Sequence, residues 1–391
     1  MPPLPLIAHL DADAFFVSCE LALRPELRGT KCAVGGRERG IISSASYEAR
    51  ACGVYTPMPT KTARKVCPDL IMLPHTSGLY GRVSRQMFDL CETLTPLVQR
   101  NSIDEGYLDL GLCGFKSIET IEERVRALQR RIWDEIQIPT SFGIATNKLV
   151  AAIASKARKP RGFTIVGAGE EASFLAPLKI SVIPGVGVKS EARLAAAGIR
   201  LVSDLFERSE RELELLFGNS WLEMLRMARG EDDRVVETEH EDAKSYSTQE
   251  TFGGDIGDVQ EIERIAKRMI DELMPKIRED GKRVKTITIK VRYPGMEDSS
   301  SSRSIAAATD LENAFYPLVT PLLKSAWTRR RPLRLVSVKF SNVEAAAGQL
   351  EMFAQLDNRK RRLAAVIDEL NARGHKSIVS RGHQLNSSEE N

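Results

Sequence analysis

The feature that most constrains the fold of this chain is an alternation of short apolar runs with longer amphipathic runs between residues 6 and 167. Short apolar runs favour buried strands, whereas a period of about 3.6 residues favours helices. The alternation predicts an α/β or α+β domain in which several loops leave the sheet at strand ends. Strands are predicted at 6–10, 32–34, 40–45, 106–110 and 140–145, and helices at 14–23, 47–52, 57–66, 80–94, 118–136 and 147–158.

The rest of the 391-residue chain is long enough for further domains, each with its own core. Residues 168–240 carry short helical periods, and the polar stretch 241–247 is a predicted linker. Residues 248–341 predict a separate small α+β domain, and residues 342–391 a polar tail with one helical stretch at 359–372. The predicted fold class is therefore α+β in several domains. In the small domain, strands are predicted at 248–252, 285–293, 302–308 and 333–340, and helices at 259–279 and 311–327.

Composition and charge exclude several classes of protein. All six cysteines lie within the first 113 residues, widely spaced and without a C-x-x-C pair, which argues against a zinc site or a disulfide framework. No apolar run is long enough to span a membrane, and the N-terminus lacks the layout of a signal peptide, so we expect a cytoplasmic protein without a membrane partner. The net charge is only +3, but residues 281–341 hold twelve Lys or Arg against four Asp or Glu. That basic segment suits a polyanion, although a solvated face explains it equally well.

Carboxylates stand at two points where apolar runs begin or end. Asp11 follows the predicted strand 6–10, and Asp104 and Glu105 precede the predicted strand 106–110. Charges at such places are costly to bury unless they are paired or bound to a metal, and three carboxylates together would require a cation. Oxygen ligands favour Mg²⁺ over zinc, and two such ions about 4 Å apart can activate a 3′-hydroxyl and neutralise a leaving pyrophosphate. From these residues alone, capping of a helix or turn explains each cluster equally well.

Six segments carry a resemblance to a known family. They are residues 11–16 followed by Glu20, then 47–50, 102–107, 143–148, 159–160 and 184–187. In this order and spacing they resemble the Y-family DNA polymerases, of the DinB or DNA polymerase IV-like type, over roughly residues 6–341. The resemblance implies a right-hand polymerase for low-fidelity translesion synthesis, with palm and fingers at 1–167 and a helical thumb at 168–240. It further implies a little finger domain at 241–341 and a tail at 342–391.

The resemblance also implies roles for individual residues. The implied catalytic metal ligands are Asp11, Asp104 and Glu105, with the backbone carbonyl of Ala12 as a further donor to two Mg²⁺ ions. Phe16 falls at the sugar-selecting position, where a ring excludes a ribose 2′-hydroxyl. The chain departs from the usual family pattern at Ala152 and Lys156, which affects the nucleotide pocket but none of the metal ligands. The implied binding residues for a deoxynucleoside triphosphate are Phe15, Phe16, Ser44, Tyr47, Arg50 and Lys159.

Two further regions are predicted to bind primer–template DNA. Residues 182–199 resemble a helix–hairpin–helix, in which glycines let backbone N–H groups face a phosphate, although a tight helix–helix turn explains the segment equally well by itself. The basic segment fits the little finger, for which salt-sensitive binding without sequence preference is expected. The predicted contacts are Gly185, Gly187 and Lys189 in the hairpin, and Lys290, Arg292, Arg303 and Arg330 in the little finger.

The tail contains a predicted partner-binding peptide. Gln349, Leu350, Met352 and Phe353 resemble the peptide by which bacterial polymerases bind the sliding clamp (the β clamp). The motif usually lies close to the C-terminus, whereas 38 residues follow it here. The 50 residues after position 341 are too few for a nuclease domain, so we expect no 3′–5′ proofreading, and we expect a monomer.

Two other classes of function remain to be weighed. A catalytically silent Y-family-like DNA-binding adaptor of a mutagenic repair complex would have lost its acidic residues, whereas Asp11, Asp104 and Glu105 are retained here. A nucleotidyl cyclase can use a similar metal site but has no need of a hairpin, a basic domain or a clamp peptide. Primer extension on a template separates the three.

Overall fold

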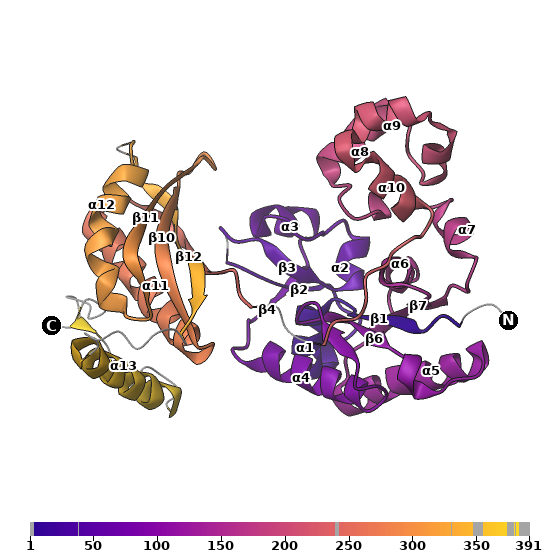
Figure 1. Cartoon of the computed structure of the whole chain (residues 1–391), viewed down its shortest axis with the longest axis horizontal. Coiled ribbons are helices and arrows are strands. Elements are labelled where there is room, and N and C mark those ends of the chain that lie inside the picture. Colours follow the sequence, from indigo (N-terminus) through magenta and orange to yellow (C-terminus); the bar gives the residue numbers. More distant parts are fainter. Residues whose placement is uncertain are drawn as a thin grey trace. The chain divides into compact units, whose positions relative to one another are not determined.

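The structure is a computed structural model, and it describes residues 4–37, 39–238, 242–329, 331–346, 355–373, 379 and 381–382. The chain divides into two compact units, residues 1–240 and residues 241–391 (Figure 1). Each unit has a hydrophobic core of its own.

The first unit is built on a five-stranded sheet in the order β5–β6–β1–β7–β8. Neighbouring strands are antiparallel except β7 and β8, which are parallel. Helices α4 and α5 cover one face of this sheet, and α6 packs on the other face against β1 and β7 (Figure 1). Both faces are therefore covered, and every residue of β7 is buried. The bounds are β1 Ile7–Ala12, β5 Val98–Arg100, β6 Glu105–Asp109, β7 Thr140–Ala145, β8 Phe163–Ile165, α1 Phe15–Ala22, α4 Leu79–Glu92, α5 Ile118–Ile136 and α6 Lys148–Ala157.

The close packing of α6 on β7 depends on Gly143. A Cβ at this position would lie 2.1 Å from the carbonyl oxygen of Ala151 and 2.2 Å from the amide nitrogen of Ser155. Helix α6 itself begins after Asn147, whose side-chain oxygen accepts a hydrogen bond from the amide of Val150 at 3.0 Å.

A small three-stranded sheet and two short helices form a separate cluster within the first unit. Its strand order is β3–β2–β4, with β3 antiparallel and β4 parallel to β2. The hydroxyl of Ser46 caps α2 by accepting a hydrogen bond from the amide of Ala49 at 3.2 Å, so that Tyr47 stands at the start of the helix. The bounds are β2 Cys32–Gly35, β3 Ile42–Ala45, β4 Ile71–Leu73, α2 Tyr47–Ala51 and α3 Thr60–Val66.

The predicted run of short helices after residue 168 is confirmed. Ser209 and Glu212 form a capping box at the start of α9, which is a local signal for a helix beginning there. The helices are α7 Glu171–Leu175, α8 Val188–Ala196, α9 Glu210–Phe217 and α10 Trp221–Ala228, and the 3₁₀ turns of the first unit are Pro25–Leu27, Gly111–Cys113, Ile180–Val182, Ser203–Glu207 and Gly218–Ser220.

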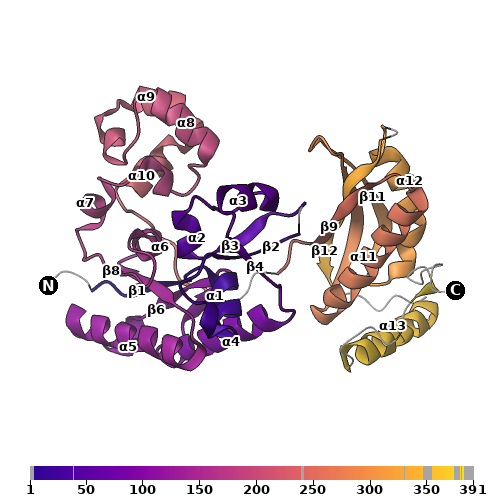
Figure 2. The ribbon, with the colours of Figure 1, turned by 180° about the vertical axis from the view of Figure 1, so that it is seen from behind.

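The second unit is an antiparallel four-stranded sheet, β11–β10–β12–β9, with α11 and α12 packed on one face (Figure 2). Alternate residues of β10 and β12 enter this core because side chains along a strand point to opposite faces. The helix α13 follows in the sequence. The bounds are β9 Ser245–Ile256, β10 Lys282–Arg292, β11 Asp298–Thr309, β12 Leu333–Ala345, α11 Val259–Glu279, α12 Tyr316–Ala326, α13 Gln355–Arg373 and the 3₁₀ turn η6 Glu312–Ala314.

Some boundaries differ from the sequence prediction. The predicted linker 241–247 was wrong at its end, because Ser245–Ser247 already belong to β9 and pair with β12. The helix predicted at 311–327 is broken at Phe315, which separates η6 from α12. The three-residue strands β4, β5 and β8 were not predicted, since so short a segment carries no periodic signal.

Candidate active site

Asp11 and Glu105 lie directly opposite each other on neighbouring strands. Asp11 is the penultimate residue of β1, and Glu105 is the first residue of β6, its antiparallel partner. The amide nitrogen of Ala12 donates to the carbonyl oxygen of Asp104 at 2.9 Å. Strand pairing therefore brings Asp11, Ala12, Asp104 and Glu105 to one end of the sheet.

The three carboxylates are paired with cationic or hydroxyl groups. Nζ of Lys159 forms an ion pair with Asp11, and Nζ of Lys156 lies 3.4 Å from Oε2 of Glu105. Asp104 accepts a hydrogen bond from the hydroxyl of Ser102 at 2.5 Å. Within the described part of the chain, no group of three or more His, Cys, Asp or Glu side chains is arranged to hold a metal ion. The acidic oxygens nevertheless attract two ammonium groups, and a hard cation such as Mg²⁺ satisfies the same oxygens, so the residues fit this ion.

Asp13 is a buried carboxylate for which the sequence indicated no role. It accepts hydrogen bonds from the hydroxyl of Ser141 at 3.0 Å, from the amide of Arg161 at 2.7 Å and from the phenol of Tyr47 at 3.3 Å. Nζ of Lys159 lies 3.3 Å from the same carboxylate. Asp13 thus holds Tyr47 and Lys159 beside the acidic cluster. The sequence feature that could have indicated a role for Asp13 is its position two residues after Asp11, immediately after the buried strand β1.

His9 is a neutral neighbour of the cluster. Burial, followed by the charges of Lys156 and Lys159, lowers the pKa of His9 to about 3. Its Nδ1 lies 2.8 Å from Oγ of Ser155, and its Nε2 lies 3.9 Å from Glu105, too far for a hydrogen bond. Burial also raises the pKa of Asp11, although Lys159 acts in the opposite direction.

The predicted phosphate-binding residues gather around α2. The guanidinium of Arg50 lies over the ring of Tyr47, 4.9 Å from its centroid, and its Nε donates to the carbonyl of Ala45 at 2.9 Å. Lys159 lies beside them because its Nζ is 3.3 Å from Oδ1 of Asp13, the oxygen that also accepts a hydrogen bond from Tyr47. Ser44 is buried in β3, just before the capping Ser46. The side chains of Tyr47, Arg50 and Lys159 are therefore hydrogen-bond donors that lie close together.

The two adjacent phenylalanines have different environments. Phe15 is 2% exposed and belongs to the core under the main sheet, so only its backbone is available to a nucleotide. Phe16 is half-buried and packs edge-on against Tyr80, with 4.8 Å between ring centroids. Ala14, which precedes them, has a left-handed backbone conformation (φ 47°) at the start of α1. This conformation is uncommon outside glycine and turns the chain sharply beside Asp13.

The predicted DNA-binding hairpin lies in the helical part of the first unit. Gly185 has φ +89°, which favours glycine, and Gly187 precedes α8, whose N-terminus has no side-chain cap. Gly185, Gly187 and Lys189 are all exposed. Uncapped N–H groups at an exposed helix start suit a phosphate oxygen.

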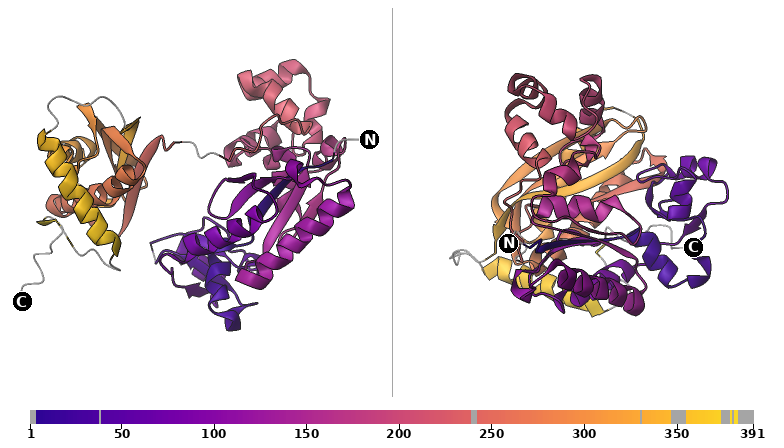
Figure 3. Two further views of the ribbon diagram at one scale, coloured as in Figure 1. Left: turned by 60° about the horizontal axis from the view of Figure 1, so that its bottom comes forward. Right: turned by 90° about the vertical axis from the view of Figure 1, so that its right-hand side faces the viewer.

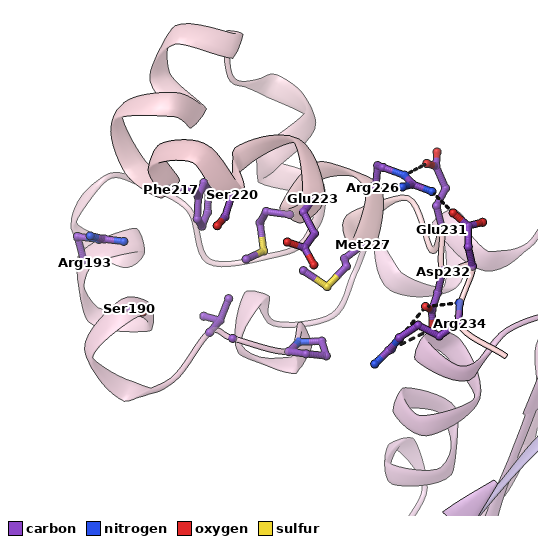
Figure 4. A pocket seen from close by; sticks show the side chains of 15 residues that line it. Ser190, Arg193, Phe217, Ser220, Glu223, Arg226, Met227, Glu231, Asp232 and Arg234 are labelled. Atoms are coloured by element: carbon purple, nitrogen blue, oxygen red, sulfur yellow. Dashed lines mark hydrogen bonds and ion pairs between the residues drawn. The ribbon is translucent and has the colours of Figure 1, made fainter. Parts of the chain in front are cut away.

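A cavity of about 770 Å³ lies behind this hairpin, between the turn 184–186, α8 and α10 (Figure 4). Two of its three arginines, Arg226 and Arg234, form ion pairs with carboxylates of the same lining, whereas Arg193 donates to the carbonyl of Leu216 at 2.7 Å. Nε of Arg226 lies 3.2 Å from Oε2 of Glu231, and its Nη2 lies 2.6 Å from Oδ2 of Asp233. Nε of Arg234 lies 2.8 Å from Oδ1 of Asp232. Because four carboxylates and three arginines line this cavity, its lining has a net negative charge and does not extend the phosphate site.

The segment after α10 connects the helices to the main sheet through polar contacts. Asn147 donates to the carbonyl of Gly230 at 2.7 Å, and Lys148 donates to the carbonyl of Val235 at 2.9 Å and to Gln99 at 2.7 Å. Asp232 accepts from the amide of Leu149 at 2.8 Å. The Asn147-Lys148 pair, which is part of the family resemblance, therefore has a structural role here.

The predicted cations of the second unit do not all share one face of the sheet. Lys290 and Arg292 project from the face that α11 and α12 leave open, and both contact Asp298, at 3.6 Å and 2.5 Å. Arg303 pairs with Ile287, which lies in the helix-covered core, so Arg303 projects on the opposite side at the β11 edge. The strand register therefore separates Arg303 from Lys290 and Arg292. The open face is otherwise rich in hydroxyls, with Thr286 and Thr288 bonded to Ser304 and Ser302.

Two predicted sites lie outside the described residues. They are Arg330 and the peptide containing Gln349, Leu350, Met352 and Phe353. All six cysteines are free thiols. No helix in the described ranges is long and apolar enough to cross a membrane.

Comparison with known proteins places this geometry in a family. Residues 10–156 match the impB/mucB/samB family, and residues 243–352 match the C-terminal domain of the same family. A solved Y-family DNA polymerase chimera superposes with a TM-score of 0.78 at 26% identity, covering 87% of this chain and 99% of the other. The chain belongs to the Y family of DNA polymerases.

This Y-family polymerase is also similar to named relatives over most of its length. It is 70% identical to a DNA polymerase IV of Opitutus terrae over 383 residues, which is 98% of each chain. An insertion ternary complex of the Dbh DNA polymerase matches it with a TM-score of 0.61 at 27% identity, covering 87% of this chain and 99% of that chain. The two family matches include Asp11, Asp104 and Glu105 but leave Lys159 and the hairpin between them.

Proposed function

We propose that this Y-family polymerase extends a DNA primer on a template, damaged templates included, with deoxynucleoside triphosphates as substrates. The observation that carries the proposal is the convergence of Asp11, Asp104 and Glu105 at one end of the sheet, next to Lys159 and its partners. The similarity to a DNA polymerase IV and to a ternary complex of a DNA polymerase supports it.

The acidic cluster would bind the metal ions, and the residues around α2 would bind the triphosphate. Two Mg²⁺ ions, held by Asp11, Asp104, Glu105 and the carbonyl of Ala12, would activate the primer 3′-hydroxyl and offset charge on the phosphates. Tyr47, Arg50 and Lys159 would bind the triphosphate. Burial and the neighbouring Asp13 raise the pKa of Tyr47, so its phenol keeps the proton that it donates. Phe16 would lie against the sugar and reject a 2′-hydroxyl.

The DNA would be held at two places without reading its sequence. The uncapped start of α8 after Gly187 offers backbone N–H groups, and Lys189 adds charge. On the second unit, the open face of the sheet offers hydroxyls together with Lys290 and Arg292. We assign residues 1–167 to palm and fingers, 168–240 to a thumb, and 241–341 to a little finger, in agreement with the division at residue 240.

The peptide at 349–353 is proposed to bind the sliding clamp. It follows β12, which ends at Ala345, and precedes α13, which begins at Gln355. A glutamine followed by apolar anchors is the feature that supports the assignment.

Primer extension on a templated duplex tests the proposal. We expect the wild-type chain to extend the primer and Asp104→Ala to bind the same DNA without extending it. Asp134→Ala, an exposed carboxylate on α5, is the matched control and should retain wild-type activity. A wild-type chain that binds DNA but extends nothing would be an adaptor, and a cyclic product formed without template would indicate a cyclase.

A further inference from the structure

A second cavity, of about 290 Å³, lies in the second unit, away from the residues assigned above. It is enclosed by β11, the turn η6 and the first part of α13. Arg283 of β10 is seven residues before Lys290, which corresponds to about 23 Å along the strand. The cavity is therefore separate from the cations of the open sheet face. Its apolar wall includes Ile305, Ala308 and Leu311, and its basic residues are Arg283, Lys360 and Arg361.

The charged side chains that line this cavity are all basic. Its lining contains no Asp or Glu among the described residues. Arg361 is bound through Nε to Asp310 at 3.0 Å, but no ion pair to a described residue is found for Lys360 or Arg283. Nε of Arg283 is buried beneath the cavity wall and has no hydrogen-bond acceptor within the described ranges, so only the outer end of the guanidinium can face a ligand.

Helix α13, the yellow helix in Figure 3, is held in place by ion pairs, and its residues Lys360 and Arg361 line the cavity. Arg278 of α11, which is 12% exposed, donates to both oxygens of Asp368, at 2.6 Å and 3.0 Å. A second ion pair, between Arg361 and Asp310, holds α13 nearer its N-terminal end. Two anchors fix the helix, and they position Lys360 and Arg361 as one wall of the cavity.

We propose that this cavity binds a phosphate group whose sugar or base rests on the apolar wall. Guanidinium and ammonium groups are the side chains that bind phosphate oxygens best, and Arg283, Lys360 and Arg361 all line this cavity. The volume lies near the lower end of the range for small-molecule sites, about 300–1,000 Å³, which limits the ligand to about one nucleotide unit. The phosphate belongs either to a free mononucleotide or to a nucleic-acid backbone.

Binding measurements on the full-length protein test this site without requiring polymerase activity. The probes are dAMP, deoxyadenosine as its phosphate-free control, and a single-stranded DNA 12-mer. EDTA is present, so that divalent cations do not assist binding at the active site. The variants are Arg283→Gln and Lys360→Ser. Arg362→Ser is the matched control, because Arg362 is exposed on the same turn of α13 and does not line the cavity.

We expect Arg283→Gln and Lys360→Ser each to weaken binding of dAMP about tenfold, with less than a twofold effect of Arg362→Ser. Deoxyadenosine should bind weakly to all four proteins. If dAMP does not bind, but the same two variants weaken 12-mer binding and flatten its salt dependence, the phosphate comes from a nucleic-acid backbone. Equal binding of both probes by all four proteins would overturn the proposal. Lys360→Ser decides the matter if Arg283→Gln does not fold, because Lys360 is exposed.

Discussion

The ammonium nitrogen of Lys156 lies 3.4 Å from Oε2 of Glu105. Lys156 belongs to α6, the helix that packs on the sheet next to the acidic cluster. The family resemblance implies an acidic residue at this position, where this chain has Lys156. If Glu105 binds a metal ion as proposed, this ion pair would compete for the same oxygen, and because the Lys156 side chain is 55% exposed the competition would be modest. We therefore expect residue 156 to adjust metal affinity without changing the ligands.

Lys156→Gln is therefore expected to tighten metal binding. Loss of a partly exposed ion pair is worth up to about 1 kcal/mol, which corresponds to about fivefold in affinity. Titration with Mn²⁺ followed by electron paramagnetic resonance measures this directly, and the Mg²⁺ dependence of primer extension should shift to lower concentration. Lys65→Gln, an exposed lysine on α3, is the control. Identical Mn²⁺ affinities for the three proteins would contradict the prediction.

Phe16→Ala is expected to increase ribonucleotide incorporation while the fold is retained. Phe16 is half-buried at the start of α1 and packs at the edge of the core, so loss of its ring should cost less stability than loss of a fully buried ring. Phe15→Ala is the matched comparison. It should destabilise the protein by about 3–5 kcal/mol, because Phe15 is in the core. Primer extension with ribonucleotides and deoxyribonucleotides, together with urea unfolding, separates the two effects. Unchanged sugar discrimination in Phe16→Ala would remove its assigned role.

Glu20→Gln is expected to lower stability in a pH-dependent way. Burial alone would raise the pKa of Glu20, but hydrogen bonds from Thr76, Tyr80 and Arg24 outweigh it and hold the pKa below its ordinary value. A carboxyl whose pKa is lower in the folded state stabilises the protein above its unfolded pKa, about 4.3, and loses that contribution as the pH falls further.

Urea unfolding at pH 7 and at pH 4 measures this effect. The difference between wild type and Glu20→Gln should be about 2 kcal/mol at pH 7 and smaller at pH 4. Glu26→Gln, at an exposed position, should match wild type at both values. A difference that is the same at pH 7 and pH 4 would argue against an ionic role for Glu20.

Gly143→Ala and Gly81→Ala are expected to have opposite effects on stability. A Cβ at Gly143 would meet backbone atoms of α6 at 2.1 Å and 2.2 Å, so the helix must move away from β7. Overpacking of this kind costs about 1–3 kcal/mol. Gly81 is exposed within α4 with open space around it, and alanine there should stabilise the helix by about 1 kcal/mol. Thermal unfolding of both variants checks the pair, and a neutral Gly143→Ala would show that α6 can shift freely.

The clamp assignment predicts a selective loss of stimulation. Deleting residues 349–353 should abolish the increase in synthesis caused by a sliding clamp and leave basal synthesis unchanged. Glu351→Ala is the control, because the middle position of the motif is variable. Processivity assays with and without clamp provide the measurement, and stimulation that survives the deletion would reject the assignment.

The sequence determined those elements whose signals are local. The helices 118–136 and 259–279 and the strand 140–145 were predicted with the bounds that the structure has. Ser117 and Asp258 cap the two helices through hydrogen bonds to nearby amides, so each boundary is set within a few residues. The acidic residues of the site were also recognisable, because charges at the ends of apolar runs need partners.

The tertiary structure decided which of these residues meet. Asp11 and Glu105 face each other only through the register of β1 and β6, and Asp13 acquires its partners from three separate segments. Lys290 of β10 and Arg303 of β11 lie in one basic segment of the sequence. The register between these two strands nevertheless places their side chains on opposite faces of the sheet. Strand register is a long-range choice made by side-chain packing, and a shift of one residue exchanges the two faces of a strand. For that reason the sequence indicated the chemistry of this protein, and packing between distant strands arranged it in space.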